Sequence, residues 1–229
     1  MQAVILAGGK GTRLRPITDL IPKPLVSLNN RPIIEWQIAY LQRAGVTDCI
    51  ISSGYKSGLI ESYLNRKTYH KIDLRYSVEE EPLGTGGAIR KAAPMITEDS
   101  FYVINGDVIT DMDLRRLITP NCIAAINLRT NFGVLETDGS QIRSFAEKRP
   151  LPDIWMNAGV YHLSSSILDD LPVQGNIEKT TFPRYAKEGR LFLERFDDTF
   201  WHSIDSYKDI EECSRNMLEH PWYSEIHIH

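Results

Sequence analysis

The chain has 229 residues, of which 42% are hydrophobic and 24% are charged, so it can bury the core of an ordinary globular domain. Its formal net charge of -4, with no dense run of Lys and Arg, argues against nucleic acid or an acidic membrane surface as the main partner. No apolar run approaches the ~20 residues of a membrane helix. No basic segment precedes the first apolar stretch, so we expect no signal peptide. The few, widely separated cysteines lack metal-ligand spacing and fit a cytoplasmic location.

Strand-like and helix-like patterns alternate through the first half of the sequence. They predict strands over residues 3–6, 49–52, 74–78 and 101–104, and helices over 33–44, 59–64 and 86–95, with Thr85 capping the last of these helices. Repeated strand–helix units predict an α/β fold, with a Rossmann-like, mostly parallel sheet flanked by helices. Ligands of such sheets bind at the carboxyl ends of the strands.

The second half of the sequence changes to shorter alternating segments. Strands are predicted over 123–128, 133–136, 142–146 and 159–163, and we expect them to form a small antiparallel extension. A helix over 181–188, a strand over 191–196 and a helix over 207–218 follow. No linker, repeat or low-complexity segment interrupts this order, so residues 1–229 are predicted to form a single domain.

A glycine-rich stretch, LAGGKGTRL over residues 6–14, follows the first predicted strand. Glycine tolerates backbone conformations in which successive N–H groups converge on an anion. Arg13 adds a planar fork of donors suited to phosphate, and Lys23 adds a compact charge between two prolines, in a loop where we expect it to be solvated. The stretch lacks the Gly-Lys-Ser/Thr of a P-loop and the helix-opening small residue of a dinucleotide fingerprint. It predicts a polyphosphate-binding loop, with a solvated turn as the simpler alternative.

The same stretch, followed by Lys23 and Pro24, matches a Leu-Ala-Gly-Gly-x-Gly-Thr-Arg-Leu and Lys-Pro signature at every fixed position. In this it resembles the sugar-1-phosphate nucleotidyltransferases, which join an NTP and a sugar 1-phosphate into an NDP-sugar and release pyrophosphate. The resemblance implies the nucleotide-diphospho-sugar transferase fold, with the NTP on about residues 1–112 and the sugar phosphate on about 113–229. It implies that Arg13 steadies the leaving phosphates and that Lys23 bridges the α-phosphate and the incoming phosphate. Nucleotide contacts are implied for Leu6, Ala7, Gly8, Gly9, Gly11, Thr12, Arg13 and Gly106.

Two carboxylates are candidates for a metal site. Asp107 directly follows an apolar strand, where a carboxylate can hold Mg²⁺ together with phosphate oxygens. The family places its first metal aspartate in such a Gly-Asp pair, and its second after an aromatic run that resembles residues 200–206, which gives Asp205. The family form is Asp-Ile-Gly, whereas this chain has Ile-Asp-Ser. The resemblance implies Mg²⁺, or Mn²⁺ in its place; the alternatives are a turn-capping Asp107 and an Asp205 that caps the last helix.

Two further segments resemble the sugar-phosphate contacts of the family. Residues 145–150 are similar to its Phe-x-Glu-Lys-Pro segment, with an additional Arg149 before the proline. The resemblance implies that Lys148 contacts the phosphate and that Glu147 accepts a sugar hydroxyl, although an exposed Glu–Lys pair is the simpler interpretation. Asn157 and Gly159 are similar to the Asn-x-Gly sugar-binding turn of the family.

The stretch EEEPLGTGG over residues 79–87 is the candidate for base recognition. Its Glu-Pro-Leu-Gly-Thr form resembles the guanylyltransferases for mannose and heptose phosphates, against a solvated acidic turn as the default. Guanine presents two adjacent donors that match the two acceptors of a carboxylate, whereas uracil and thymine present one donor between two carbonyls. We therefore expect GTP over UTP and dTTP, with Glu79 or Glu81 contacting the base and Gly84 giving backbone approach. The segment around Asp205 resembles cytidylyltransferases and favours CTP instead.

Two other functions compete with this interpretation. Asp111, Met112 and Asp113 form an Asp-x-Asp, which metal-dependent glycosyltransferases use, but those enzymes have no need of the glycine-rich loop with Arg13. A catalytically silent, nucleotide-sensing subunit is the second alternative, and the intact Arg13, Lys23, Asp107 and Lys148 argue against it. The partners implied are the NTP and the sugar 1-phosphate, and the sequence leaves open whether the protein is a homo-oligomer.

Overall fold

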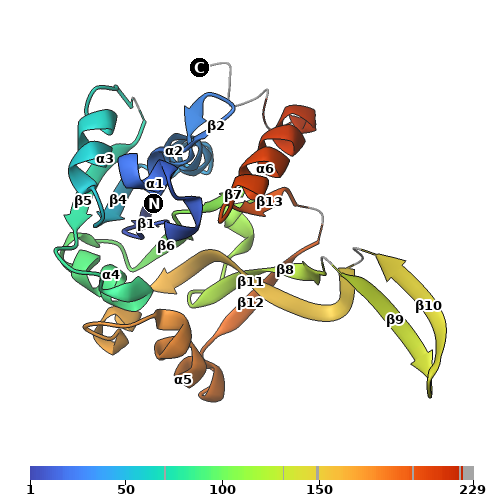
Figure 1. The fold of residues 1–229 in the computed structure, drawn as a ribbon. Coiled ribbons are helices and arrows are strands. Elements are labelled where there is room, and N and C mark those ends of the chain that lie inside the picture. Colours follow the sequence, from blue (N-terminus) through green and yellow to red (C-terminus); the bar gives the residue numbers. More distant parts are fainter. Residues whose placement is uncertain (70, 131, 148–149, 198, 222, 224–229) are drawn as a thin grey trace.

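The computed structural model describes residues 1–229 except 70, 131, 148–149, 198, 222 and 224–229. Its centre is a seven-stranded sheet in the order β12-β8-β11-β6-β1-β4-β5 (Figure 1). The strands span Gln2–Ala7 (β1), Asp48–Ser53 (β4), Asp73–Val78 (β5), Ser100–Asn105 (β6), Cys122–Arg129 (β8), Pro150–Ser164 (β11) and Phe192–Phe196 (β12). β11 runs antiparallel to both of its neighbours, and the other pairs are parallel. The predicted α/β fold with a mostly parallel sheet is confirmed.

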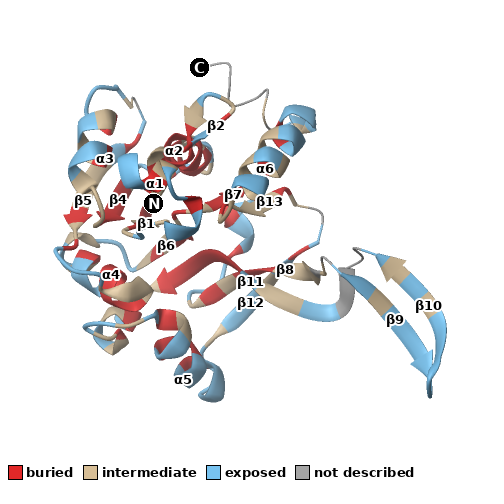
Figure 2. Cartoon of the chain, in the orientation of Figure 1, coloured by how far each residue is buried: buried red, intermediate tan, exposed pale blue. Residues whose placement is uncertain are grey.

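Helices cover both faces of this sheet because its strands alternate apolar side chains between the two faces. Ala3 and Ile5 of β1 belong to one buried cluster with residues of α2 (Ile33–Arg43) and α3 (Ser57–Leu64). Val4, between them, belongs to a second cluster with residues of α4 (Gly84–Ala92) and α5 (Thr181–Lys187). Buried residues accordingly follow the central strands and the inner sides of the helices (Figure 2).

A third buried cluster joins the end of the chain to its beginning. It packs Cys213 and Met217 of α6 (Tyr207–Glu219) with Ile33 and Trp36 of α2. The short elements α1 (Ile17–Leu20), β2 (Ser27–Leu28) and β3 (Arg31–Pro32) lie between β1 and α2 in the sequence. None of the helices in the described residues has both the length and the apolar character that crossing a bilayer requires.

The second half of the chain has the predicted antiparallel pairing, but only part of it lies outside the central sheet. β8, β11 and β12 join the central sheet, and a separate hairpin of β9 (Gly133–Asp138) and β10 (Gln141–Glu147) projects from its end (Figures 1 and 2). β11 is longer than predicted, and Val160, Tyr161 and Leu163 in its second half are buried beside β6. Apolar side chains on both faces make this part a central strand rather than one face of a small extension.

The predicted cap of α4 is wrong. The residue that precedes the helix is Leu83, without a side-chain cap, and the helix begins at Gly84. The hydroxyl of Thr85 instead donates a hydrogen bond to Glu178 Oε2 at 2.5 Å and accepts one from Ile177 N–H at 3.0 Å. Both partners of this hydroxyl lie more than 90 residues away in the sequence, so the residues around Thr85 do not indicate the contact.

Candidate active site

A cavity of about 390 Å³ opens at the carboxyl ends of β1 and β6. It brings together most of the residues singled out in the sequence: Leu6, Ala7, Gly8, Gly9, Gly11, Thr12, Arg13, Lys23, Glu79, Gly84, Gly106, Asp107 and Asp205. The remaining lining residues were not named as ligand contacts, although the first four belong to the motifs quoted above: Leu14, Pro24, Pro82, Thr85, Ala88, Asn105 and Asn176. Asn105 and Thr85 border predicted site residues in the sequence, so adjacency could have indicated them. Asn176 comes from a distant loop and carried no signal.

Glycine is required where the two strands leave the sheet together. The N–H of Gly106 donates to the carbonyl oxygen of Leu6 at 2.9 Å, and a Cβ on Gly106 would overlap that oxygen. Gly11 has a φ of 61°, in the left-handed region, and its missing Cβ leaves room for the side chains of Thr18 and Lys23. These close approaches bring Gly106, which precedes Asp107, against β1 and bring Lys23 against Gly11, so that both charged residues line the same cavity as the glycine loop of residues 8–11.

Two cations and two carboxylates form an ionic cluster in this cavity. Lys23 Nζ donates to Asp107 Oδ2 at 2.9 Å and to Asp205 Oδ1 at 3.0 Å. Arg13 Nη2 donates to the same Asp205 oxygen at 2.7 Å. The expected solvation of Lys23 is wrong: its side chain is 13% exposed, against 72% for Arg13, because both carboxylates enclose its ammonium group. We call these four residues the ionic cluster.

Two short strands bring the carboxylates together. β7 (Val108–Thr110) pairs antiparallel with β13 (Trp201–Ser203), and Ile204 N–H continues the ladder by donating to Asp107 O at 2.9 Å. Asp107 precedes β7 and Asp205 follows β13, so antiparallel pairing sets them at the same end. The sequence did not predict either strand, because three residues are too few to show a period.

Asp205 is held next to α6 without capping it. The N-cap is Ser206, which forms a capping box with Asp209. The backbone N–H of Asp205 also donates to Asp209 Oδ2, at 2.9 Å. The alternative of a capping Asp205 is therefore excluded, and its side chain is available to the ionic cluster.

The surroundings of Asp205 favour its ionised form. Burial acts to raise the pKa of this carboxyl, but the hydrogen bond and charge of Lys23, with the charge of Arg13, outweigh it and hold the pKa below its usual range. Asp205 is thus an anion at neutral pH, as a ligand for a cation requires.

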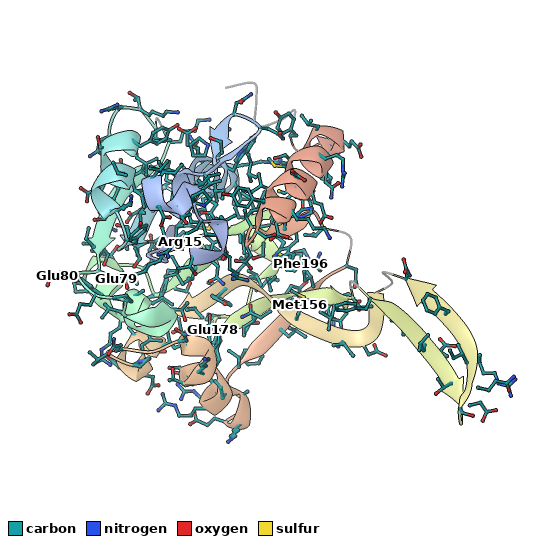
Figure 3. All side chains as sticks on the ribbon, in the orientation of Figure 1. Arg15, Glu79, Glu80, Met156, Glu178 and Phe196 are labelled. Carbon is teal, nitrogen blue, oxygen red and sulfur yellow. The ribbon has the colours of Figure 1, made fainter. Side chains whose placement is uncertain are left out.

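Of the three glutamates before Pro82, the cavity is lined by Glu79. Its side chain is buried, with Oε2 accepting a hydrogen bond from Leu83 N–H at 2.9 Å and Oε1 next to Gly8. Glu80 and Glu81 are exposed and do not line the cavity. In Figure 3 Glu80 points out of the molecule, whereas Glu79 lies within it.

Three of the predicted sugar-phosphate residues, Asn157, Gly159 and Glu147, do not line the cavity. Asn157 Oδ1 accepts a hydrogen bond from Gly159 N–H at 2.8 Å, and its Nδ2 donates to Tyr161 OH at 2.9 Å. Gly159, with a φ of 71°, lies against the side chain of Asn105, which lines the cavity. Glu147 is exposed at the end of β10 and does not line the cavity. Lys148 and Arg149 lie outside the described residues.

The Asp-x-Asp of residues 111–113 lies elsewhere. Asp111 and Asp113 line a different cavity of about 260 Å³ together with Arg43 and Arg115. Asp111 Oδ1 accepts a hydrogen bond from Phe200 N–H at 2.9 Å, and Asp113 pairs with Arg115. The two aspartates therefore hold local structure and do not border the glycine loop.

Residues 2–220 match the profile of the family described as Nucleotidyl transferase. The chain belongs to this family. It is 36% identical over 230 residues to D-glycero-alpha-D-manno-heptose 1-phosphate guanylyltransferase of Aneurinibacillus thermoaerophilus, covering 95% of this chain and 98% of the relative. It is 35% identical over 229 residues to mannose-1-phosphate guanyltransferase beta-A of Xenopus laevis, covering 91% of this chain. This chain spans 62% of the length of the Xenopus relative.

A solved structure with a bound nucleotide analogue has the same fold. HddC from Yersinia pseudotuberculosis complexed with GMP-PN superposes with a TM-score of 0.72 at 28% identity, over 94% of this chain and 98% of that one. The resemblance inferred from the glycine-rich stretch is confirmed by these comparisons.

The ionic cluster makes the stability of this protein depend on pH. Because the folded-state pKa of Asp205 lies below its ordinary value of about 3.9, the unfolded chain takes up the proton first as the pH falls. The stabilisation is complete above about pH 4 and is lost as the pH falls through the folded-state pKa. Lys23→Met should lower the free energy of unfolding at pH 7 by about 2 kcal/mol, a typical value for hydrogen bonds to charged groups.

Urea denaturation in metal-free buffer measures this difference at pH 7 and at pH 3. The difference in the free energy of unfolding between wild type and Lys23→Met should be smaller at pH 3 than at pH 7. Lys91→Met, which changes an exposed lysine of α4, should have the same free energy of unfolding as wild type at both pH values. A gap that stays constant or widens in acid contradicts the assignment.

Proposed function

We propose that this protein is a sugar-1-phosphate guanylyltransferase, which joins GTP and a sugar 1-phosphate into a GDP-sugar and releases pyrophosphate. The observation that carries the proposal is the ionic cluster beside the glycine loop, in the cavity at the carboxyl ends of β1 and β6. The names of the relatives, two guanylyltransferases and a protein bound to GMP-PN, support this reaction and this base.

The chemistry that we propose is a single in-line displacement. A phosphate oxygen of the sugar 1-phosphate attacks the α-phosphorus of GTP, the bond to the bridging oxygen breaks, and pyrophosphate leaves with that electron pair. The backbone N–H groups of the glycine loop and Arg13 hold the leaving phosphates, and Lys23 neutralises charge between the α-phosphate and the incoming phosphate. Such a site works by positioning and by charge stabilisation. Residues 1–112 would bind the nucleotide and residues 113–229 the sugar phosphate. Asp205 belongs to the second part but bonds Arg13 and Lys23 of the first.

We propose Glu79, rather than Glu81, as the residue that contacts guanine. Glu79 lines the cavity and is 8% exposed, so a base that failed to bond it would leave a buried acceptor unpaired. Leu83 N–H fixes one of its oxygens at 2.9 Å, yet a carboxylate oxygen accepts more than one hydrogen bond. Both oxygens therefore remain acceptors for the two adjacent donors of guanine.

Competition among GTP, CTP, UTP and dTTP with one accepted sugar 1-phosphate tests this proposal, with pyrophosphate release as the readout. Wild type should prefer GTP, and Glu79→Gln should lower kcat/KM for GTP on the order of 10- to 100-fold, the usual range for one lost charged hydrogen-bond partner. Glu81→Gln is the matched control and should stay close to wild type. A preference for UTP or dTTP contradicts the base assignment, and transfer from an NDP-sugar without pyrophosphate release would favour the glycosyltransferase alternative.

A divalent metal fits the carboxylates of the ionic cluster. Among the described residues there is no group of three or more His, Cys, Asp or Glu that could hold a metal ion. Mg²⁺ characteristically takes one or two protein carboxylates together with substrate phosphate oxygens. Asp107 and Asp205 match that donor set, and in this structure they already share one cation, the ammonium group of Lys23. We propose that they hold Mg²⁺, or Mn²⁺ in its place, which would neutralise charge on the reacting phosphates.

Metal binding by these carboxylates requires Lys23 to move, since its ammonium group bonds both of them. Lys23→Met should therefore tighten the binding of Mn²⁺ to the nucleotide-free protein on the order of tenfold or more, given the energy of like charges ~4 Å apart in a protein. Arg13→Met is the matched control, because its side chain is 72% exposed and bonds only Asp205 within the ionic cluster, so its effect should be smaller. Titration with Mn²⁺ followed by paramagnetic resonance measures the Mn²⁺ affinity of each variant. An equal change in affinity in the two variants, or weaker Mn²⁺ binding in Lys23→Met, contradicts the proposal.

A further inference from the structure

A turn outside the cavity bonds the segment of residues 12–25, which carries Arg13 and Lys23. The turn follows β4, and its residues Tyr55 and Lys56 bond three successive carbonyls of α1. Tyr55 OH donates to the carbonyl of Thr18 at 2.9 Å, and Lys56 Nζ donates to the carbonyls of Asp19 at 2.6 Å and Leu20 at 3.0 Å. The last carbonyls of a helix have no partner within the helix, so these bonds satisfy groups that α1 itself leaves open.

The same turn also holds the glycine loop. Tyr55 N–H donates to the carbonyl of Gly8 at 3.3 Å. Thr18, whose carbonyl Tyr55 bonds, donates its own hydroxyl to the carbonyl of Gly11 at 2.9 Å and is 1% exposed. The turn therefore bonds Gly8 at one end of the glycine loop directly, reaches Gly11 at the other end through Thr18, and bonds the segment between Arg13 and Lys23.

This segment has little structure of its own. Residues 12–25 contain the one-turn 3-10 helices Thr12–Leu14 and Lys23–Leu25 and the four-residue α1. Elements this short are unstable in isolation, so the positions of Arg13 and Lys23 depend on contacts from outside. Lys56 itself has a left-handed φ of 54°, which is unfavourable for a residue with a Cβ, and its ammonium group lies 5.4 Å from the centre of the Tyr55 ring. Backbone strain of this kind is retained where the surrounding structure uses it.

We propose that Tyr55 and Lys56 form a clamp that positions Arg13 and Lys23 for the triphosphate. Neither residue lines the cavity, so both act through the backbone of residues 8–20 and are positioning residues. The inference rests on the proposed function, because it assigns the cations to phosphate. Without the clamp, Arg13 and Lys23 are still present, but each side chain occupies several positions. The protein then binds phosphate more weakly and reacts more slowly.

Binding of inorganic triphosphate, measured by calorimetry, tests the clamp without depending on the base or the sugar. The double variant Tyr55→Phe with Lys56→Met should bind it about tenfold more weakly than wild type, as expected for the loss of three hydrogen bonds of modest net strength. Pyrophosphate release from GTP should show a higher KM and a lower kcat together. The single variant Lys56→Arg, which keeps a cation for the same carbonyls, should retain most of the wild-type affinity for triphosphate.

Matched controls separate positioning from general stability. Tyr76→Phe removes a tyrosine hydroxyl that bonds Asn65 on the surface, and Lys91→Met removes an exposed lysine; both should bind triphosphate as wild type does. Thermal unfolding monitors each variant, and the loss of affinity should appear in protein that remains fully folded at the assay temperature. Unchanged affinity in the double variant overturns the clamp while leaving the proposed function intact. If wild type itself fails to bind triphosphate, both the proposed function and the clamp are overturned.

Discussion

The ammonium group of Lys23, shared by Asp107 and Asp205, is the contact on which the site depends. A lysine that is 13% exposed has left most of its water, and a charge in that position is tolerated only with close partners of opposite sign. Those partners come from the exit of β6 and from the loop before α6, while Lys23 comes from the segment after the glycine loop. The requirement to satisfy one charge therefore fixes three distant parts of the chain relative to one another.

The surrounding structure can be understood as support for this contact. Pairing of β7 with β13 sets the two aspartates at one end of a ladder, and the capping box of Ser206 and Asp209 leaves Asp205 free to face Lys23. The absence of a Cβ at Gly106 lets the exit of β6 approach β1. Tyr55 and Lys56 bond carbonyls of α1, and Tyr55 also bonds the carbonyl of Gly8 in the glycine loop. A site arranged in this way holds its charges close together at one end of the sheet, and in the proposed mechanism Lys23 leaves its two carboxylates when a metal binds them.

Features that depend on neighbours in the sequence could be predicted, and features that depend on distant partners could not. The apolar run over residues 3–6 predicted a strand, which the structure shows as β1, and the glycine-rich stretch after it predicted a ligand-binding loop, which lines the cavity. Lys23 was expected to be solvated because its partners are 84 and 182 residues away. Thr85 was expected to cap a helix, but its hydroxyl bonds Glu178, 93 residues later.

Other differences have the same origin. The strands next to Asp107 and Asp205 are too short to show a pattern. β11 was predicted as a short strand, and its pairing with β8 shifts register between Asn157 and Tyr161, around the left-handed Gly159. Asn176 reaches the cavity from a loop whose sequence resembles any polar turn. The roles of Glu147 and Lys148 stay predictions, as does the division of the chain near residue 112. These depend on where a bound sugar phosphate lies.

The stereochemistry of the reaction at phosphorus tests the central claim most directly, namely that the site positions two substrates for one displacement. GTP that carries sulfur at the α-phosphorus in one known configuration would be converted with a sugar 1-phosphate, and the configuration of the GDP-sugar product determined by phosphorus resonance. A single in-line attack inverts the configuration at phosphorus, and inversion is the predicted result. Retention would mean two successive displacements through a covalent nucleotidyl–protein intermediate, and it would contradict the account.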